Sequence, residues 1–193
     1  MQKPAYSQSI VEQARFIDDF STFMNSVGDC WIGGGWCASL ITERLQREHG
    51  GVDLCAESSN REDILDYLLD NGFSIRAQTK NKLIANKDDL RAYIVLMDYA
   101  NGCFMFSTEK FYKNIRVPKE FFRRHEGSIE DLGLAAITLT PALFVSSKKA
   151  YGSHMRDKDL SDIRAVEAKL AEEGMEKERE LYEKESRELL AYR

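Results

Sequence analysis

The sequence predicts an α/β (α+β) protein, in which a mixed sheet flanked by helices is followed by a C-terminal helical segment. Helices alternate with short apolar strands in the first part of the chain. Several strand-like stretches then follow one another, and from Thr140 onward the apolar residues return to helical spacing. We expect an α/β domain over residues 1–139 and a helical segment, packed on it, over residues 140–193.

The N-terminal part is predicted to begin with a long helix. Ser9 and Glu12 have the S-x-x-E spacing of a capping box, and the apolar residues behind them recur at helical spacing up to Gly28. A similar box at Ser59 and Glu62 opens a later helix that stops at Asn71-Gly72. Between these two helices we expect a strand, a helix and a strand over residues 30–32, 36–45 and 52–56.

The middle of the chain is predicted to be mostly strand. An Asn101-Gly102 turn separates two strongly β-like runs. The expected strands cover residues 73–78, 82–85, 92–97 and 103–106, with further short strands and loops over residues 115–118 and 127–139.

The last third of the chain is predicted to be helical. Thr140-Pro141 is a cap followed by a first-turn proline, and a further helix starts at about Asp157. From residue 172 onward the chain carries eight acidic and five basic residues, with apolar residues every seven positions at Met175, Tyr182 and Leu189. We expect this tail to pack along the body of the protein, or to bind a protein partner or a second copy.

Composition restricts the class of protein. The chain has 193 residues with a net charge of −5, and it contains no apolar run long enough to span a membrane. The first residues show no apolar core of a secretory signal, so we expect a cytoplasmic protein. There is no long basic stretch, and nucleic acid is therefore not the expected partner. The cysteines lie in apolar segments without metal-binding spacing and are predicted to be free thiols: Cys30, Cys37, Cys55 and Cys103.

The most informative stretch is the glycine run Gly33-Gly34-Gly35, which lies between a predicted strand and a predicted helix. A glycine-rich turn at the start of a helix brings backbone N–H groups close to a phosphate, and the positive end of the helix adds to the attraction. Taken alone, the run is equally consistent with a tight turn that has no ligand.

Two motifs extend this signal. Gly34-Gly35-Trp36 is followed, at the next strand, by Arg47, His49 and Asp53, and later by the run from Arg156 to Ile163. Together these residues resemble the nucleotidyltransferase superfamily with the polymerase-β-like fold, especially its lincosamide- and aminoglycoside-type antibiotic nucleotidyltransferases. That family has the patterns G-G-W, R-x-H-x-D-x-D and R-x-K-D-x-x-D-I. The resemblance covers roughly residues 8 to 170.

The resemblance implies a reaction and a site. Such an enzyme moves a nucleoside monophosphate from a nucleoside triphosphate, with Mg²⁺, to a hydroxyl group of a small molecule. It implies that Asp53 is the catalytic carboxylate and metal ligand. The same resemblance assigns nucleotide binding to Gly34, Gly35, Arg47, His49 and Lys158, and places Lys148 and Lys149 near the triphosphate.

The sequence departs from the family pattern at the metal site. The first aspartate of the D-x-D pair is replaced by Gly51, and the best register for the third carboxylate places Tyr93 there. Three interpretations remain open. The protein is an active enzyme with unrecognised metal ligands, a nucleotide-binding frame without transfer chemistry, or a structural and partner-binding module.

Overall fold

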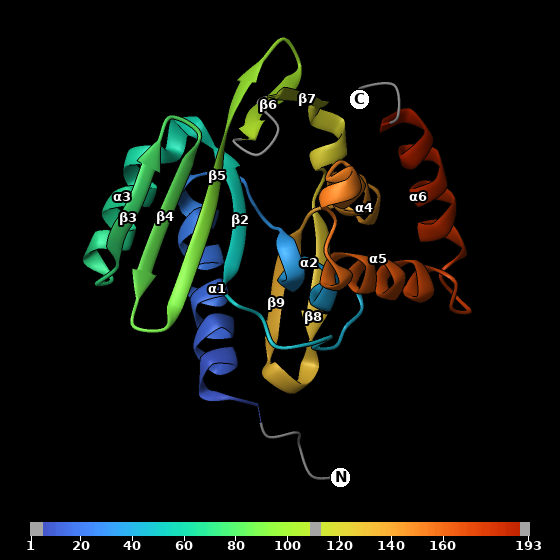
Figure 1. The fold of residues 1–193 in the computed structure, drawn as a ribbon, viewed down its shortest axis with the longest axis horizontal. Helices are drawn as coiled ribbons and strands as arrows, with labels where there is room; N and C mark the ends of the chain where they lie inside the picture. Colours follow the sequence, from blue (N-terminus) through green and yellow to red (C-terminus); the bar gives the residue numbers. More distant parts are fainter. Residues whose placement is uncertain (1–5, 109–112, 190–193) are drawn as a thin grey trace.

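The computed structural model describes residues 6–108 and 113–189, so the start of the chain, on which the signal-peptide prediction partly rests, lies outside the described residues. The N-terminal part alternates helices and strands, as predicted (Figure 1). Its elements are α1 (Gln8–Val27), β1 (Cys30–Ile32), α2 (Gly34–Ile41), β2 (Val52–Glu57) and α3 (Arg61–Asp70).

A run of strands follows and is then succeeded by three helices. The strands are β3 (Ser74–Thr79), β4 (Lys82–Lys87), β5 (Leu90–Ala100), β6 (Cys103–Thr108), β7 (Lys113–Pro118), β8 (His125–Ile129) and β9 (Leu134–Thr138). The helices are α4 (Pro141–Lys149), α5 (Asp157–Leu170) and α6 (Glu176–Leu189).

The strands form one mixed sheet in the order β3-β4-β5-β2-β1-β9-β8. The pairs β2/β5 and β1/β9 are parallel, and the others along this path are antiparallel. The far end of β5 extends beyond the main sheet and pairs with β6, which pairs with β7 (Figure 1). The predicted mixed α/β class is therefore confirmed.

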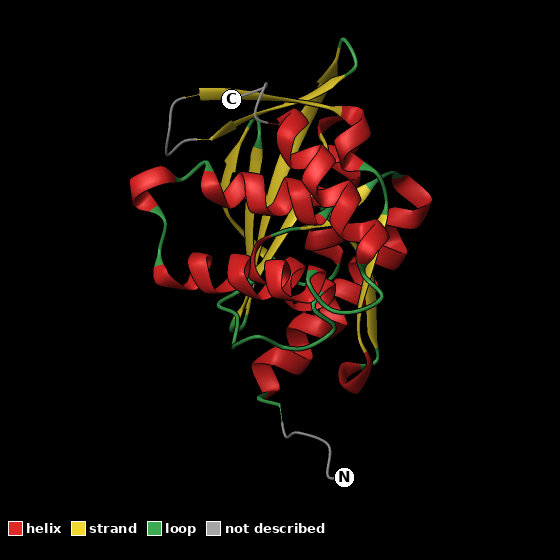
Figure 2. Ribbon diagram, turned by 90° about the vertical axis from the view of Figure 1, so that its right-hand side faces the viewer, coloured by secondary structure: helices red, strands yellow, loops and turns green. Residues whose placement is uncertain are grey.

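The sheet separates two apolar cores. One core lies against α1 and α3 and takes Leu54 and Ile94 from the sheet. The other lies against α4, α5 and α6 and takes Trp31 and Phe104 from the strands. Figure 2 shows the helices on this second side lying in front of the strands. Because side chains alternate along a strand, Asp53 belongs to the face of the second core.

The C-terminal helix packs on the body of the protein. Leu189 is buried in the second core, and Met175 and Tyr182 pack against that core from their half-buried positions. The carboxylate of Glu185 accepts a hydrogen bond of 2.9 Å from Arg123 Nε. The seven-residue spacing therefore indicates an intramolecular contact, while the division at residue 139 stays a prediction. No described helix is long and apolar enough to cross a membrane.

Both predicted capping boxes are wrong, although the helices that they announce exist. Helix α1 begins two residues earlier than the box implies, and its cap is Ser7, whose Oγ accepts from Ile10 N at 3.4 Å. Helix α3 follows a 3₁₀ turn, and its cap Asn60 makes no side-chain capping bond. The helix predicted to reach residue 45 ends at Ile41, after which Thr42 Oγ1 bonds back to Ala38 O. The Thr140 cap is confirmed.

Gly127 provides a test of how closely α2 approaches the sheet. A Cβ atom on Gly127 of β8 would lie 2.8 Å from the Cβ and carbonyl carbon of Leu40. We expect Gly127→Ala to destabilise the protein by about 1–3 kcal/mol through overpacking. Urea unfolding would measure this change. The control is Gly50→Ala, where a Cβ meets nothing within 4 Å; equal effects of the two substitutions would contradict the close approach.

Candidate functional site

The glycine turn between β1 and α2 packs directly on Asp53. Gly33 N donates a hydrogen bond of 2.8 Å to the backbone oxygen of Asp53. Gly34 has a φ of 58°, and a Cβ there would lie 2.6 Å from Asp53 Cγ. Only glycine therefore fits. The Asp53 carboxylate lies at the amino end of α2, where a negative charge is favoured by the helix dipole.

The next glycine makes room for two other predicted site residues. A Cβ on Gly35 would lie 2.5 Å from Arg47 Nη2 and 2.6 Å from His49 Nδ1. Arg47 and His49 reach this place from the segment between α2 and β2. The structure thus brings Gly34, Gly35, Arg47 and His49 together with Asp53, as the resemblance implies.

His49 is a buried, neutral side chain. Its Nε2 lies 2.9 Å from Ser39 Oγ, and its ring centroid is 4.8 Å from that of Trp36. Gln13 holds both Trp36 and His49 in place, because its Oε1 accepts from Trp36 Nε1 at 2.8 Å and its Nε2 donates to the His49 carbonyl at 3.0 Å. Burial, followed by the charge of Arg47, lowers the pKa of His49 to about 3. His49 Nδ1 has no hydrogen-bond partner within the described residues.

A buried ionic cluster lies beside the turn. Asp159 and Asp162 of α5 are each 1% exposed. Lys148 Nζ of α4 lies 2.7 Å from Asp159 Oδ1 and 3.8 Å from Asp162 Oδ2. Arg47 forms a two-pronged pair with Asp162, at 3.2 and 2.9 Å, and Arg156 forms another with Asp159, at 2.8 and 3.1 Å. The two aspartates therefore hold three cations in fixed positions.

The cations influence the titration of the carboxylates. Burial alone would raise the pKa of Asp159, but hydrogen bonds from Arg156 and Lys148 outweigh it and hold the pKa well below its usual range. Asp53 behaves differently. It is exposed to solvent on one side, but the protein atoms packed around its carboxylate remove part of its hydration, and this raises its pKa. Four positive charges act against this rise, those of Lys148, Lys158, Arg156 and Arg47.

Lys158 is an exposed cation at the start of α5. It forms no ion pair within the described part of the chain, unlike Arg47, Lys148 and Arg156. Loss of hydration, followed by the nearby charges of Arg156 and Arg47, lowers its pKa. A lysine surrounded by like charges gains from contact with an anion. Lys149, in contrast, pairs with Glu167 at 3.0 Å on the surface.

The two positions that depart from the family pattern are in contact with each other. Asp53 is the register partner of Tyr93 in the parallel β2/β5 pair. A Cβ on Gly51 would lie 2.6 Å from the Arg91 carbonyl and 3.3 Å from Cε2 of the Tyr93 ring. Arg91 Nη1 donates to the Tyr93 hydroxyl at 3.0 Å. Tyr93 and Arg91 therefore occupy the space beside Gly51 that an aspartate would need.

The side chains around Asp53 bear on the metal ions that the resemblance implies. Mg²⁺ prefers carboxylate and other oxygen ligands, and among the described residues no group of three acidic, histidine or cysteine side chains is arranged to hold a metal ion. Asp159 and Asp162 already bond to cations. Asp98, at the far end of β5, is also engaged by other groups: it accepts a hydrogen bond from Ser58 Oγ and pairs with Lys80.

The sequence does not reveal every residue of this site. Arg156 lies in the family-like run, but only the structure shows that its guanidinium completes the ionic cluster. Tyr151, just before that run, is given no role by the sequence, although the charge of Asp53, after burial, contributes to raising its pKa. A signal was present in the alternation of charges through Arg156, Asp157, Lys158 and Asp159, but the pairing partners lie on other elements.

The sheet order, the glycine turn and the flanking helices define a nucleotidyltransferase fold, and comparison with solved structures confirms this class. The crystal structure of the lincosamide antibiotic adenylyltransferase LnuA with lincomycin bound matches with a TM-score of 0.65 at 16% identity, over 81% of this chain and 96% of that one. ANT(2'')-Ia in complex with adenylyl-2''-tobramycin matches with a TM-score of 0.64 at 16% identity, over 92% and 99%.

A more distant match is an antigenic nucleotidyltransferase-like protein from Paracoccidioides brasiliensis. Its TM-score is 0.52 at 17% identity, over 84% of this chain and 77% of that one. No protein-family model and no curated protein matches the sequence. At these identities the likeness establishes the fold.

His49 gives a pH-dependent test of the site. Its folded-state pKa of about 3 lies below the usual histidine value of 6.5. The unfolded chain therefore binds this proton first, and stability falls as the pH drops below 6.5. From about pH 7.5 to 5.5 this one group removes ~1.4 kcal/mol. We expect His49→Gln to lose that part of the pH dependence in urea unfolding. Identical pH profiles for the two proteins would contradict a buried neutral histidine.

Proposed function

We propose that this protein binds a nucleoside triphosphate at the site around Asp53 and does not carry out metal-assisted nucleotidyl transfer. The observation that carries the proposal is the balance of charge around Asp53. Arg47, Lys148, Arg156 and Lys158 act on this one carboxylate, and its register partner is a tyrosine. Such a site favours an anion over a pair of divalent cations.

The positive charges support a polyphosphate as the ligand. Arginine matches phosphate oxygens with two parallel N–H donors, and lysine acts as a point charge. Arg156 is half exposed, and Lys158 is exposed and without an ion pair among the described residues. Arg156 is the N-cap of α5 and Lys158 lies in its first turn, so both side chains can contact one ligand. Asp159 holds the Arg156 guanidinium from the buried side.

Gly51 and Tyr93, which stand where the family has carboxylates, support nucleotide binding without nucleotidyl transfer. Transfer by two metal ions needs several carboxylates within reach of both ions. Gly51 has no side chain, and the Arg91 carbonyl leaves no space for one there. Tyr93 carries a phenol that already accepts a hydrogen bond from Arg91.

The solved neighbours support a nucleotide as the ligand class. One is described as an adenylyltransferase and another contains an adenylylated antibiotic. Transfer of an adenylyl group to a hydroxyl of a small molecule, with Mg²⁺, is therefore the outcome that our proposal excludes. For this chain the nucleotide remains a proposal, and adenosine triphosphate is the first probe.

Replacement of Asp53 distinguishes a carboxylate that holds metal from one that only lies beside the bound nucleotide. If Asp53 holds metal, Asp53→Asn weakens or abolishes binding of Mg²⁺-adenosine triphosphate. If Asp53 is a negative charge beside the ligand, removing it leaves binding unchanged or strengthens it. We expect the second result in calorimetric titrations with and without Mg²⁺, and no release of pyrophosphate from the wild-type protein.

Lys158 provides the matched cation test. We expect Lys158→Gln to weaken triphosphate binding about tenfold, because a charge-assisted hydrogen bond to an ionised group is lost. Lys177→Gln in α6, an exposed lysine away from the site, is the control and should leave binding unchanged. Absence of binding by any nucleoside triphosphate at about millimolar concentration, which is the weak limit of specific recognition, would overturn the proposal. Metal-dependent pyrophosphate release would overturn its second part.

A further inference from the structure

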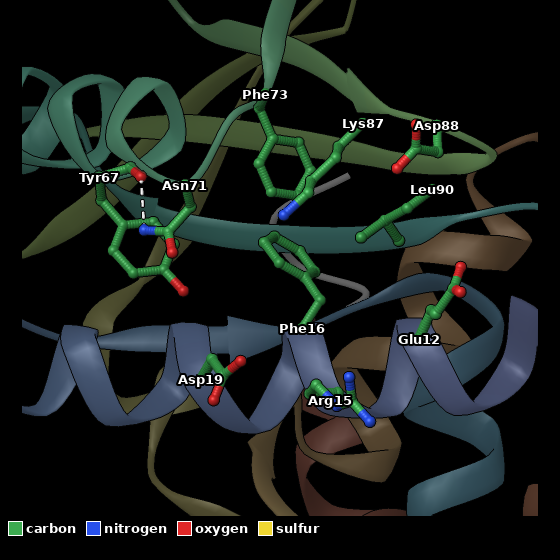
Figure 3. A pocket seen from close by; sticks show the side chains of 10 residues that line it. All are labelled: Glu12, Arg15, Phe16, Asp19, Tyr67, Asn71, Phe73, Lys87, Asp88 and Leu90. Carbon is green, nitrogen blue, oxygen red and sulfur yellow. Dashed lines mark hydrogen bonds between the residues drawn. The ribbon is translucent and has the colours of Figure 1, made fainter.

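A cavity lies on the other face of the sheet from Asp53. It has a volume of about 230 Å³ and is bounded by α1, the end of α3, the start of β3 and the β4–β5 turn (Figure 3). Its apolar residues belong to the α1/α3 core, whereas Asp53 lies on the opposite side of β2. The cavity is therefore independent of the nucleotide proposal.

The floor of the cavity is aromatic and rigid. Phe16 and Phe73 are each 5% exposed, with ring centroids 5.1 Å apart and planes inclined at 45°. Leu90 closes one side, and Tyr67 forms the wall on the other, where it stacks on Phe23 at 4.4 Å. These side chains come from helices and strands of the main core, so the shape is formed before any ligand arrives.

Charged groups of both signs line the cavity and do not pair with each other. Lys87 Nζ lies 6.0 Å from the Phe73 ring centroid and projects toward the two rings (Figure 3). Within the described residues neither Lys87 nor Arg15 has a carboxylate at ion-pair distance. Among the described residues, none of the three acidic residues that line the cavity has a cation at ion-pair distance. These acidic residues are Glu12, Asp19 and Asp88.

We propose that this cavity binds a small aromatic zwitterion, a molecule with one ring, one carboxylate and one ammonium group, as an aromatic amino acid presents. An apolar cavity of about 150 Å³ already holds benzene, so 230 Å³ leaves room for a ring with a short charged chain. The ring packs on Phe16 and Phe73. The carboxylate meets Lys87 and Arg15, and the ammonium group meets the acidic side of the cavity at Glu12.

The charge balance favours a zwitterion over aromatic ligands with a single charge. An aromatic anion would meet Lys87 and Arg15 but would leave three carboxylates around it without a counter-charge. An aromatic amine would meet the carboxylates but would repel the two cations. A zwitterion supplies a partner to both sets at once, and this complementarity selects one class of ligand.

The full-length protein and the free amino acid phenylalanine test the proposal. We expect phenylalanine to shift the amide resonances of α1 and the β4–β5 turn in a saturable titration. Phenethylamine, which lacks the carboxylate, and 3-phenylpropionate, which lacks the ammonium group, should each bind about three- to tenfold more weakly, because each loses one charge-assisted contact.

Two variants assign the charges to residues. Lys87→Gln should weaken phenylalanine binding but strengthen phenethylamine binding, because the repulsion of the ammonium group is removed. Glu12→Gln should weaken phenylalanine binding but strengthen 3-phenylpropionate binding for the same reason. Both residues lie at the surface of the fold, and Lys177→Gln is again the charge-matched control. Saturating adenosine triphosphate should not displace phenylalanine, which keeps this test separate from the nucleotide proposal.

Two results would overturn the proposal. One is the absence of a saturable shift with phenylalanine, tyrosine or tryptophan at about 10 mM, beyond the range of specific recognition. The other is equal affinity for phenylalanine and its two singly charged analogues, since the cavity would then select only the ring.

Discussion

The buried ion pairs of α5 are the constraint on which the candidate site depends. Asp159 and Asp162 are almost wholly removed from water, so each must keep a cationic partner. Their partners come from α4, from the start of α5 and from the segment before β2. Loss of one member of such a set typically costs about 3–5 kcal/mol, because the other charge stays buried and unpaired. The same pairs that fix the helices also fix the cations that surround Asp53.

The glycine turn connects this ionic cluster to the sheet. Helix α2 is buried along its length, with Trp36 and Leu40 in one core and Cys37 and Ile41 in the other. The turn that connects such a helix to β1 must lack side chains, because Asp53, Arg47 and His49 pack directly against this turn. The glycines therefore serve packing as well as any phosphate. A G-G-W sequence alone does not separate the two roles.

Local patterns in the sequence were sufficient to predict most of the fold, but they could not predict the side-chain pairs of the site. The strand Cys30–Ile32 follows from a short apolar run that ends in glycines. The capping boxes failed because Ser7 and a 3₁₀ turn competed for the helix starts. The pair between Arg47 and Asp162 joins residues 115 positions apart, and no local pattern carries that information.

The packing around Gly51 explains why Gly51→Asp alone cannot create a carboxylate pair with Asp53. An aspartate at position 51 would meet the Arg91 carbonyl, a backbone atom that cannot move without shifting β5. It would also meet the Tyr93 ring, which Arg91 holds through a hydrogen bond. Gly51, Arg91 and Tyr93 therefore pack as one unit. Arg91 and Tyr93 fill the space that a side chain at position 51 would need. Arg91 and Tyr93, instead of a second carboxylate, therefore lie beside Gly51 at the start of β2.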